Sequence, residues 1–208
     1  MKNLGWNIDA FLYDIFLGRV DKKLYKDVLL VLGKVKKGVK IDEFGCGTGE
    51  LTRRLPKSAK IRAVDYSPNA LKKVEQKTQK NVKVFCLDFY KKQPKGRPDI
   101  LIACRSLYHK DVEKSMKMLS KHIGKGTVII AHPQPSWWKY VFPKTKGFRL
   151  PSFIQLVKSY GRFANMTGQA PYALFSSKKW LKVAKKYFKN VKLYRAAHDT
   201  HYILKLSK

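Results

Sequence analysis

The stretch Glu43–Leu51, EFGCGTGEL, decides the fold of this chain of 208 residues. It directly follows a strand-like segment, VKIDEF at 39–44, and opens a segment with helical character, ELTRRL at 50–55. Its glycines at 45, 47 and 49 permit positive φ angles and let a ligand lie against bare backbone. A glycine-rich turn between a strand and a helix binds nucleotides in general, so by itself it indicates a nucleotide-like ligand without identifying it.

Strands and helices alternate after this turn. The pattern predicts strands at 60–65, 81–88, 99–104 and 126–132, helices at 68–79, 110–122 and 177–188, and two closing strands at 191–197 and 201–207. Strands separated by helices need right-handed crossovers. The fold class is therefore α/β, a doubly wound, mostly parallel seven-stranded Rossmann-like sheet. Apolar spacing over residues 8–33 adds two N-terminal helices that end near Gly33.

The charge of the chain is unusual and unevenly placed. Lys and Arg number 45 against 14 Asp and Glu, which gives a formal net charge of +31. Between Glu113 and Asp199 there is no carboxylate. Such a field indicates an anionic neighbour, which could be nucleic acid, an anionic membrane surface or an acidic substrate, although a general lysine bias of the source proteome would give the same composition.

Cysteine usage and the N-terminus bear on the cellular compartment. Cys46, Cys86 and Cys104 lie far apart, without the C-x-x-C or Cys/His spacing of a zinc site, so no metal is expected. Asp9 and Asp14 interrupt the apolar N-terminal stretch, and no run is long enough for a transmembrane segment. We expect a cytoplasmic protein, with peripheral membrane association as a further option.

The motif E-F-G-C-G-T-G resembles motif I of the class I S-adenosylmethionine-dependent methyltransferases, and later motifs fall in register over residues 39–132. The resemblance implies S-adenosyl-L-methionine as cofactor. In motif I it implies contacts from Glu43, Gly45, Cys46, Gly47, Thr48 and Gly49. For Glu43, support of the glycine loop and contact with the ligand are both compatible with the family pattern.

Two further acids match the family. Asp65, followed by Tyr66, lies where the family places the acid that bonds both ribose hydroxyls, a role that suits a carboxylate because it accepts from two donors at once. Asp88, with Phe89 beside it, matches the acid near the adenine amino group. The alternative is that these acids only cap helices or turns. Acids are rare in this chain, yet each of the first three predicted strands ends beside one. This placement favours the cofactor contacts that the resemblance implies over a capping role.

The segment CRSLYHKDV after the fourth strand resembles the part of the family that follows the methyl-donor pocket. Cys104, at the end of that strand, is a predicted cofactor contact. Tyr108 and His109 are the predicted catalytic residues, with His109 as a base or as a group that orients the acceptor. A capping or packing role for His109 is the alternative. His132, at the end of the fifth strand, is a second candidate.

The resemblance also suggests a division of the single domain 1–208. Residues 1–36 would form an N-terminal helical lid, 37–132 the cofactor-binding core, 133–175 an insertion or acceptor lid, and 176–208 a closing helix and strands. The segment from Trp6 to Asp14 is similar to the lid helix of the ubiquinone/menaquinone-type and phospholipid N-methyltransferases, which makes Tyr13 a candidate cofactor contact or else a core aromatic.

The predicted function is therefore methyl transfer from S-adenosylmethionine to a small-molecule or lipid-like acceptor, with the basic second half docked on an anionic membrane surface. The amphipathic stretch PSFIQLVKSYGRF at 151–163 would suit such a surface, but it could equally pack on its own domain. RNA is the alternative partner, with basic side chains on phosphates and the aromatic residues Trp137, Trp138 and Tyr140 on bases. A non-catalytic RNA-binding protein with this fold is a third possibility, which the intact motifs disfavour.

Overall fold

A single sheet organises the computed structural model, which describes residues 22–78, 80–107, 111–134 and 176–208. Its strands are β1 (Lys40–Phe44), β2 (Lys60–Asp65), β3 (Val82–Cys86), β4 (Ile100–Cys104), β5 (Thr127–Pro133), β6 (Asn190–Ala196) and β7 (His201–Ser207). They lie in the order β3-β2-β1-β4-β5-β7-β6. Strands β1 to β5 are parallel, and β7 is antiparallel to β5 and β6. The predicted mostly parallel seven-stranded sheet is confirmed.

The strand order reverses beside β1. From β1 the chain moves outward through β2 and β3, and it then returns to place β4 on the other side of β1. Glu43 pairs with Ala63 of β2 and with Ile102 of β4, so the carboxyl ends of these three strands lie at one edge of the sheet. In open α/β sheets ligands bind at this edge, at the point where the order reverses.

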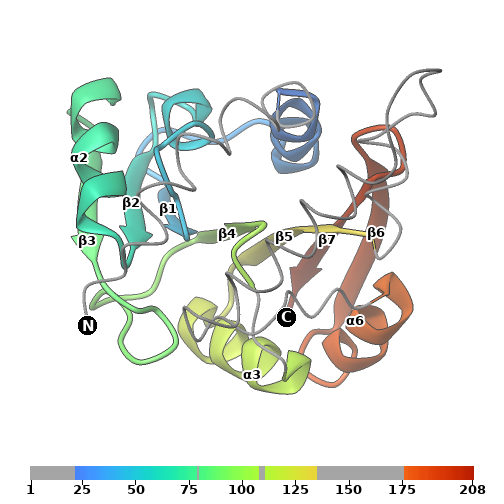
Figure 1. Ribbon diagram of the computed structural model, residues 1–208. Helices are drawn as coiled ribbons and strands as arrows, with labels where there is room; N and C mark the ends of the chain where they lie inside the picture. The colour runs from blue at the N-terminus through green and yellow to red at the C-terminus, as the bar shows by residue number, and fades with distance from the viewer. Residues whose placement is uncertain (1–21, 79, 108–110, 135–175) are drawn as a thin grey trace, which may run out of the picture.

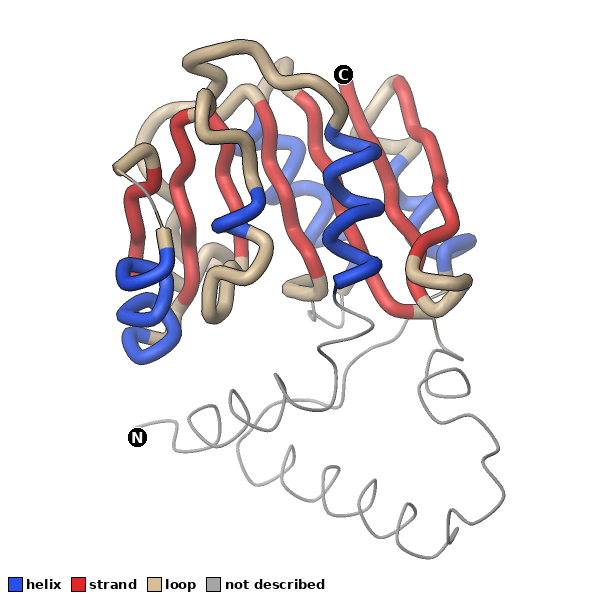
Figure 2. Tube along the Cα trace, turned by 90° about the horizontal axis from the view of Figure 1, so that it is seen from above, coloured by secondary structure: helices blue, strands red, loops and turns tan. Residues whose placement is uncertain are grey.

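Helices cover both faces of the sheet (Figures 1 and 2). Residues 22–32 form a helix that lies on one face together with α2 (Pro68–Lys77), and α3 (Val112–Ile123) and α6 (Ser177–Ala184) cover the other face. Local signals set their ends: the Ser67 hydroxyl caps α2 by accepting from Ala70 N at 3.3 Å, and Asp111 caps α3. The predicted N-terminal lid before residue 22 and almost all of the predicted insertion lie outside the described residues.

The helix expected over 50–55 is reduced to one turn of 3-10 helix, η1 (Thr52–Arg54). Pro56 explains the difference, because a proline disfavours the α conformation in the residue before it. Leu55 accordingly has an extended backbone, with φ −64° and ψ 153°. The side chains of Arg53 and Arg54 both donate to Oε2 of Glu50, and these hydrogen bonds stabilise the turn.

Each face of the sheet has its own hydrophobic core. On one face α3 and α6 pack against the sheet, and Trp180 and Tyr202 are almost fully buried there. On the other face Leu24 and Val28 of the 22–32 helix cover the central strands. Burial of each large apolar side chain contributes about 1.5–3 kcal/mol, so both layers help to hold the edge on which the candidate site is built. Among the described residues, no helix is long and apolar enough to cross a membrane.

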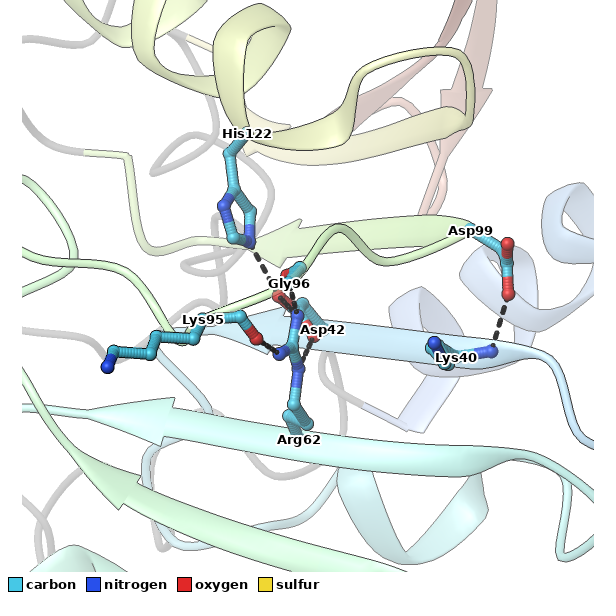
Figure 3. Close-up of polar contacts among 7 residues, drawn as sticks. All are labelled: Lys40, Asp42, Arg62, Lys95, Gly96, Asp99 and His122. Atoms are coloured by element: carbon cyan, nitrogen blue, oxygen red, sulfur yellow. Dashed lines mark hydrogen bonds and ion pairs between the residues drawn. The ribbon is translucent and has the colours of Figure 1, made fainter.

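A buried ionic network fixes the centre of the sheet (Figure 3). Asp42 of β1 is fully buried and accepts from Arg62 Nε at 2.5 Å and from Arg62 Nη2 at 2.8 Å. The Asp42 Oδ2 atom also lies 2.7 Å from Nε2 of His122 on α3. Arg62 donates in addition to the carbonyl oxygens of Lys95 and Gly96. Asp42 thus joins β1, β2 and α3, and Arg62 extends the network to the loop before β4.

Candidate functional site

The glycine loop after β1 is tied to β2 and to the chain after β4. The amides of Gly45 and Cys46 both donate to Val64 O, at 2.7 and 3.1 Å. Gly45 has φ +70°, and a Cβ atom there would lie 2.2 Å from Cβ of Ser106. Gly47 has φ +53°, and a Cβ atom there would meet nothing within 4 Å. Gly45 therefore permits close packing, whereas Gly47 leaves bare backbone open to a ligand.

The other motif I residues mainly hold the loop in place. A Cβ atom on Gly49 would lie 3.1 Å from Val74 Cγ2, so this glycine lets α2 approach the loop. Cys46 is buried, and its burial raises the pKa of the thiol well above its ordinary value, with smaller contributions from Glu43 and Asp65. Thr48 is half-buried in the same loop.

Asp65 lies at the carboxyl end of β2 and faces the loop. Its Oδ2 accepts from Gly47 N and its Oδ1 from Ser67 N, both at 2.9 Å. Burial raises the pKa of this carboxyl group, although the backbone N–H groups oppose the shift. Each carboxylate oxygen has two lone pairs, so Asp65 can still accept from a pair of vicinal hydroxyls. The next residue, Tyr66, is 41% exposed.

Glu43 is the most perturbed acid of the site. It is buried at the end of β1, and this burial raises the pKa of its carboxyl group to about 8, with a further increase from Asp65 and an opposing effect of the Thr52 hydroxyl. Its Oε2 atom is buried and has no hydrogen-bond partner among the described residues. A buried acceptor of this kind favours a cationic ligand, because the ligand's charge would stabilise the ionised carboxylate.

The ends of β3 and β4 carry the remaining predicted contacts. Asp88 is 44% exposed at its side chain, and its Oδ1 accepts from Tyr90 N at 3.0 Å. Cys104 is half-buried at the end of β4. Phe89 differs from its neighbour: it lies in the hydrophobic core, where its ring stacks on Phe44 with centroids 4.9 Å apart. The structure thus gives Phe89 a packing role.

Tyr13, Tyr108 and His109 lie outside the described residues. His132 is described, and its ring lies between two core aromatic residues, with centroids 5.3 Å from Trp180 and 5.6 Å from Tyr202. Burial lowers the pKa of His132, so the ring is neutral near pH 7. These contacts favour a packing role for His132 over a catalytic one.

Sequence reasoning missed two neighbours of the glycine loop. Ser106 packs against Gly45, and its hydroxyl is buried without a hydrogen-bond partner among the described residues. Thr52 lies beside Glu43 and is almost fully buried. The position of Ser106, two residues after a strand that ends at the ligand edge, is the signal that could have identified it. Nothing in the local sequence marks Thr52.

The residues at this edge fit S-adenosylmethionine. An open glycine backbone at Gly47, a carboxylate with spare acceptor capacity at Asp65 and a buried, partnerless oxygen on Glu43 suit a ligand that has a ribose diol and a cationic centre. A phosphate is a poor match for the part of the edge formed by β1 and β2, because acids stand there where a phosphate site needs donors.

Comparison with known proteins supports this fit. A family model described as "Methyltransferase domain" matches residues 43–129. The chain is 28% identical over 135 residues to a malonyl-[acyl-carrier protein] O-methyltransferase from Bacillus anthracis, a match that covers 60% of this chain. The match covers 49% of that curated relative, so the chain spans about half of its length.

Solved structures share the fold at low identity. The N-methyltransferase NodS from Bradyrhizobium japonicum, in complex with S-adenosyl-l-homocysteine, is 12% identical with a TM-score of 0.61, covering 92% of this chain and 86% of that chain. The phosphoethanolamine N-methyltransferase 2 from Haemonchus contortus, in complex with S-adenosyl-L-methionine, is 18% identical with a TM-score of 0.64. That match covers 89% of this chain and 42% of the Haemonchus chain.

Proposed function

We propose that the chain is a class I S-adenosylmethionine-dependent methyltransferase, with S-adenosylmethionine as cofactor, and that it methylates a small-molecule or lipid-like acceptor. The observation that carries the proposal is the pair of buried acids, Glu43 and Asp65, around the open backbone of Gly47. In a chain with a net charge of +31, a cationic cofactor needs such local acids to be retained.

Each residue of the site has a proposed task. Asp65 would accept from the ribose hydroxyls, Glu43 would stabilise the positive charge, and Asp88 would accept from the adenine amino group. When bound, S-adenosylmethionine supplies an electrophilic methyl group. In-line displacement at that group depends on alignment and on exclusion of water, and the rigid glycine loop serves the alignment. Tyr108 and His109 stay our candidates for the groups that orient or deprotonate the acceptor.

Two relatives support a small or lipid-like acceptor. The Bacillus relative is named for methylation of a malonyl group on an acyl-carrier protein, and the Haemonchus structure is named for methylation of phosphoethanolamine. Both names refer to a compact polar group rather than to a nucleic acid. We extend this acceptor class to the present chain as a proposal.

Calorimetry with S-adenosylmethionine tests the cofactor site. Asp65→Asn keeps the size of the side chain but removes its charge, and we expect it to weaken binding at least tenfold, because hydrogen bonds to a charged group contribute about 1.5–3 kcal/mol. Asp99→Asn is the matched control. Asp99 is an exposed residue before β4, and its Oδ2 accepts a hydrogen bond from Lys40 N at 2.8 Å. Equal affinities of wild type and Asp65→Asn would refute the assignment of Asp65.

Docking on an anionic membrane is the second part of the proposal. The stretch at 151–163 that supports it lies outside the described residues, so this part is based on the sequence. Sedimentation with vesicles of phosphatidylcholine and phosphatidylserine, over a salt series, tests it. We expect binding at low salt that falls as salt screens the lysines. Absence of binding at low salt would remove the membrane from the proposal.

A basic groove supports RNA as the alternative partner. It lies between α3 and the loop at 93–97, has a volume of about 600 Å³, and has no acid among the described residues that line it. Its cationic side chains are Arg97, Lys114, Lys117 and Lys121. Retention on RNA that falls steeply with salt and weakens in a Lys117→Ala, Lys121→Ala double variant would favour RNA. Unchanged retention in the double variant would exclude this groove as the binding surface.

A further inference from the structure

A second group of buried polar side chains lies at the same edge of the sheet, beyond β4. Arg105 directly follows β4, and its amide donates to Ala131 O of β5 at 2.8 Å. His201 begins β7 and pairs with Pro133 at the end of β5. Arg105 and His201 therefore flank the carboxyl end of β5, on the side of β4 away from β1 and β2.

Arg105 is held in an uncommon backbone conformation. Its φ is +53°, in the left-handed region that non-glycine residues seldom adopt, and only 9% of the residue is exposed. Its Nη2 atom lies 3.5 Å from the hydroxyl of Tyr25, which comes from the 22–32 helix. Such a backbone conformation costs free energy and persists only where the surrounding structure enforces it. Residues of this kind cluster at functional sites, and Arg105 lies at the edge of the sheet where ligands bind.

His201 donates one hydrogen bond from a buried position, and its burial decides whether the ring also carries a positive charge. The Thr200 hydroxyl donates its only proton to Ala197 O at 2.6 Å, so it must accept from Nδ1–H of His201 at 2.7 Å. Burial, with smaller contributions from the positive charge of Arg105 and from the interaction with His132, lowers the pKa of His201 to about 3. His201 is thus neutral near pH 7, and the charge in this group belongs to Arg105.

We propose that Arg105 binds an anionic group of the methyl acceptor, a carboxylate or a phosphate. This inference rests on the proposed function and names the chemistry of its substrate. The edge of the sheet is divided by charge: two acids at the ends of β1 and β2 suit the cationic cofactor, whereas the guanidinium after β4 suits an anion. A guanidinium has a planar fork of donors that matches a carboxylate or a phosphate in two parallel hydrogen bonds.

A purely structural role for Arg105 is the competing explanation, because the contact with Tyr25 also holds the 22–32 helix against the sheet edge. Three variants separate the two roles. Arg105→Asn removes the charge with a residue that tolerates the left-handed conformation. Tyr25→Phe removes the hydroxyl contact and keeps the arginine. Lys192→Asn removes one positive charge from an exposed position on β6, as a control for general attraction of anions.

The full chain, saturated with S-adenosylhomocysteine, is titrated with paired probes in 0.15 M salt and followed by nuclear magnetic resonance. One pair is butyrate and butyramide, which tests a carboxylate, and the other is butyl phosphate and butanol, which tests a phosphate. We expect one anion to bind more tightly than its neutral partner, and Arg105→Asn to weaken that binding at least tenfold. Tyr25→Phe and Lys192→Asn should stay within about twofold of wild type.

The spectrum of His201 gives a second readout. Because the Arg105 charge acts on the His201 ring, an anion bound to Arg105 should shift the ring resonances of His201 at pH 7, as should Arg105→Asn, whereas Lys192→Asn should not. Equal anion binding by wild type and Arg105→Asn would overturn the inference, and so would an equal loss in Tyr25→Phe or Lys192→Asn. Failure of wild type to bind S-adenosylhomocysteine would instead overturn the proposed function.

Discussion

Binding of S-adenosylmethionine should release a proton from Glu43. Without ligand, burial raises the pKa of this carboxyl group to about 8, so at pH 7 about nine molecules in ten hold the proton. A sulfonium or ammonium group beside the buried Oε2 atom would stabilise the carboxylate and lower that pKa. Binding at pH 7 is therefore expected to release about 0.9 proton per cofactor.

The same linkage sets the pH dependence of affinity. Since the ligand favours the ionised form, affinity should rise with pH, close to tenfold per unit below pH 7, and level off as the pH passes the pKa of about 8. Each tenfold step corresponds to about 1.4 kcal/mol of binding free energy. Glu43→Gln removes the titrating group, so the variant should bind with an affinity that hardly changes between pH 5.5 and 7.

Calorimetry in buffers with different ionisation enthalpies measures the released proton. The control is Glu75→Gln, which removes an exposed acid on α2 and should release the same number of protons as wild type. Glu43→Gln should release almost none. If wild type binds without proton release and with constant affinity over this pH range, the placement of Glu43 beside the cationic part of the cofactor is wrong.

Two predictions concern stability in urea unfolding. Asp42→Asn should lower the free energy of unfolding by about 3 kcal/mol, because it leaves the partly buried Arg62 without its counter-charge, whereas Asp99→Asn should lower it by under about 1 kcal/mol. Similar losses in the two variants would show that the Asp42 network contributes little. Gly45→Ala should cost about 2–4 kcal/mol, because its Cβ would clash with Ser106. The Cβ of Gly47→Ala would meet no such contact, so this variant should lose only about 1 kcal/mol of the free energy of unfolding, while its cofactor binding weakens. Equal free energies of unfolding for the two glycine variants would contradict the packing of Gly45 against Ser106.

Much of the fold could be predicted because strand and helix signals are local. The strands at 60–65 and 201–207 were predicted to the residue, since apolar alternation and flanking turns define both ends. The helix expected over 50–55 is wrong, because Pro56 disfavours the α conformation of Leu55 and only one turn of 3-10 helix forms. The antiparallel placement of β7 between β5 and β6 could not be predicted, because no single segment of the sequence specifies it.

The candidate site divides in the same way. Glu43 and Asp65 could be predicted because each stands in a short motif at the end of a strand. Arg105 and Tyr25 could not, because they are 80 residues apart and meet only when the 22–32 helix packs on the sheet. His122 and Asp42 are also 80 residues apart, and their contact depends on how α3 crosses β1.

The glycine loop, the alternation of strands and helices and the acids at the strand ends were determined by the sequence itself, because backbone freedom, side-chain period and residue chemistry are properties of short segments. Only the tertiary structure decided the protonation of Glu43, the left-handed backbone of Arg105 and the division of the sheet edge into an acidic and a basic side. The physical reason is that pKa values and electrostatic fields depend on desolvation and on neighbours from distant segments, which exist only after the chain has folded.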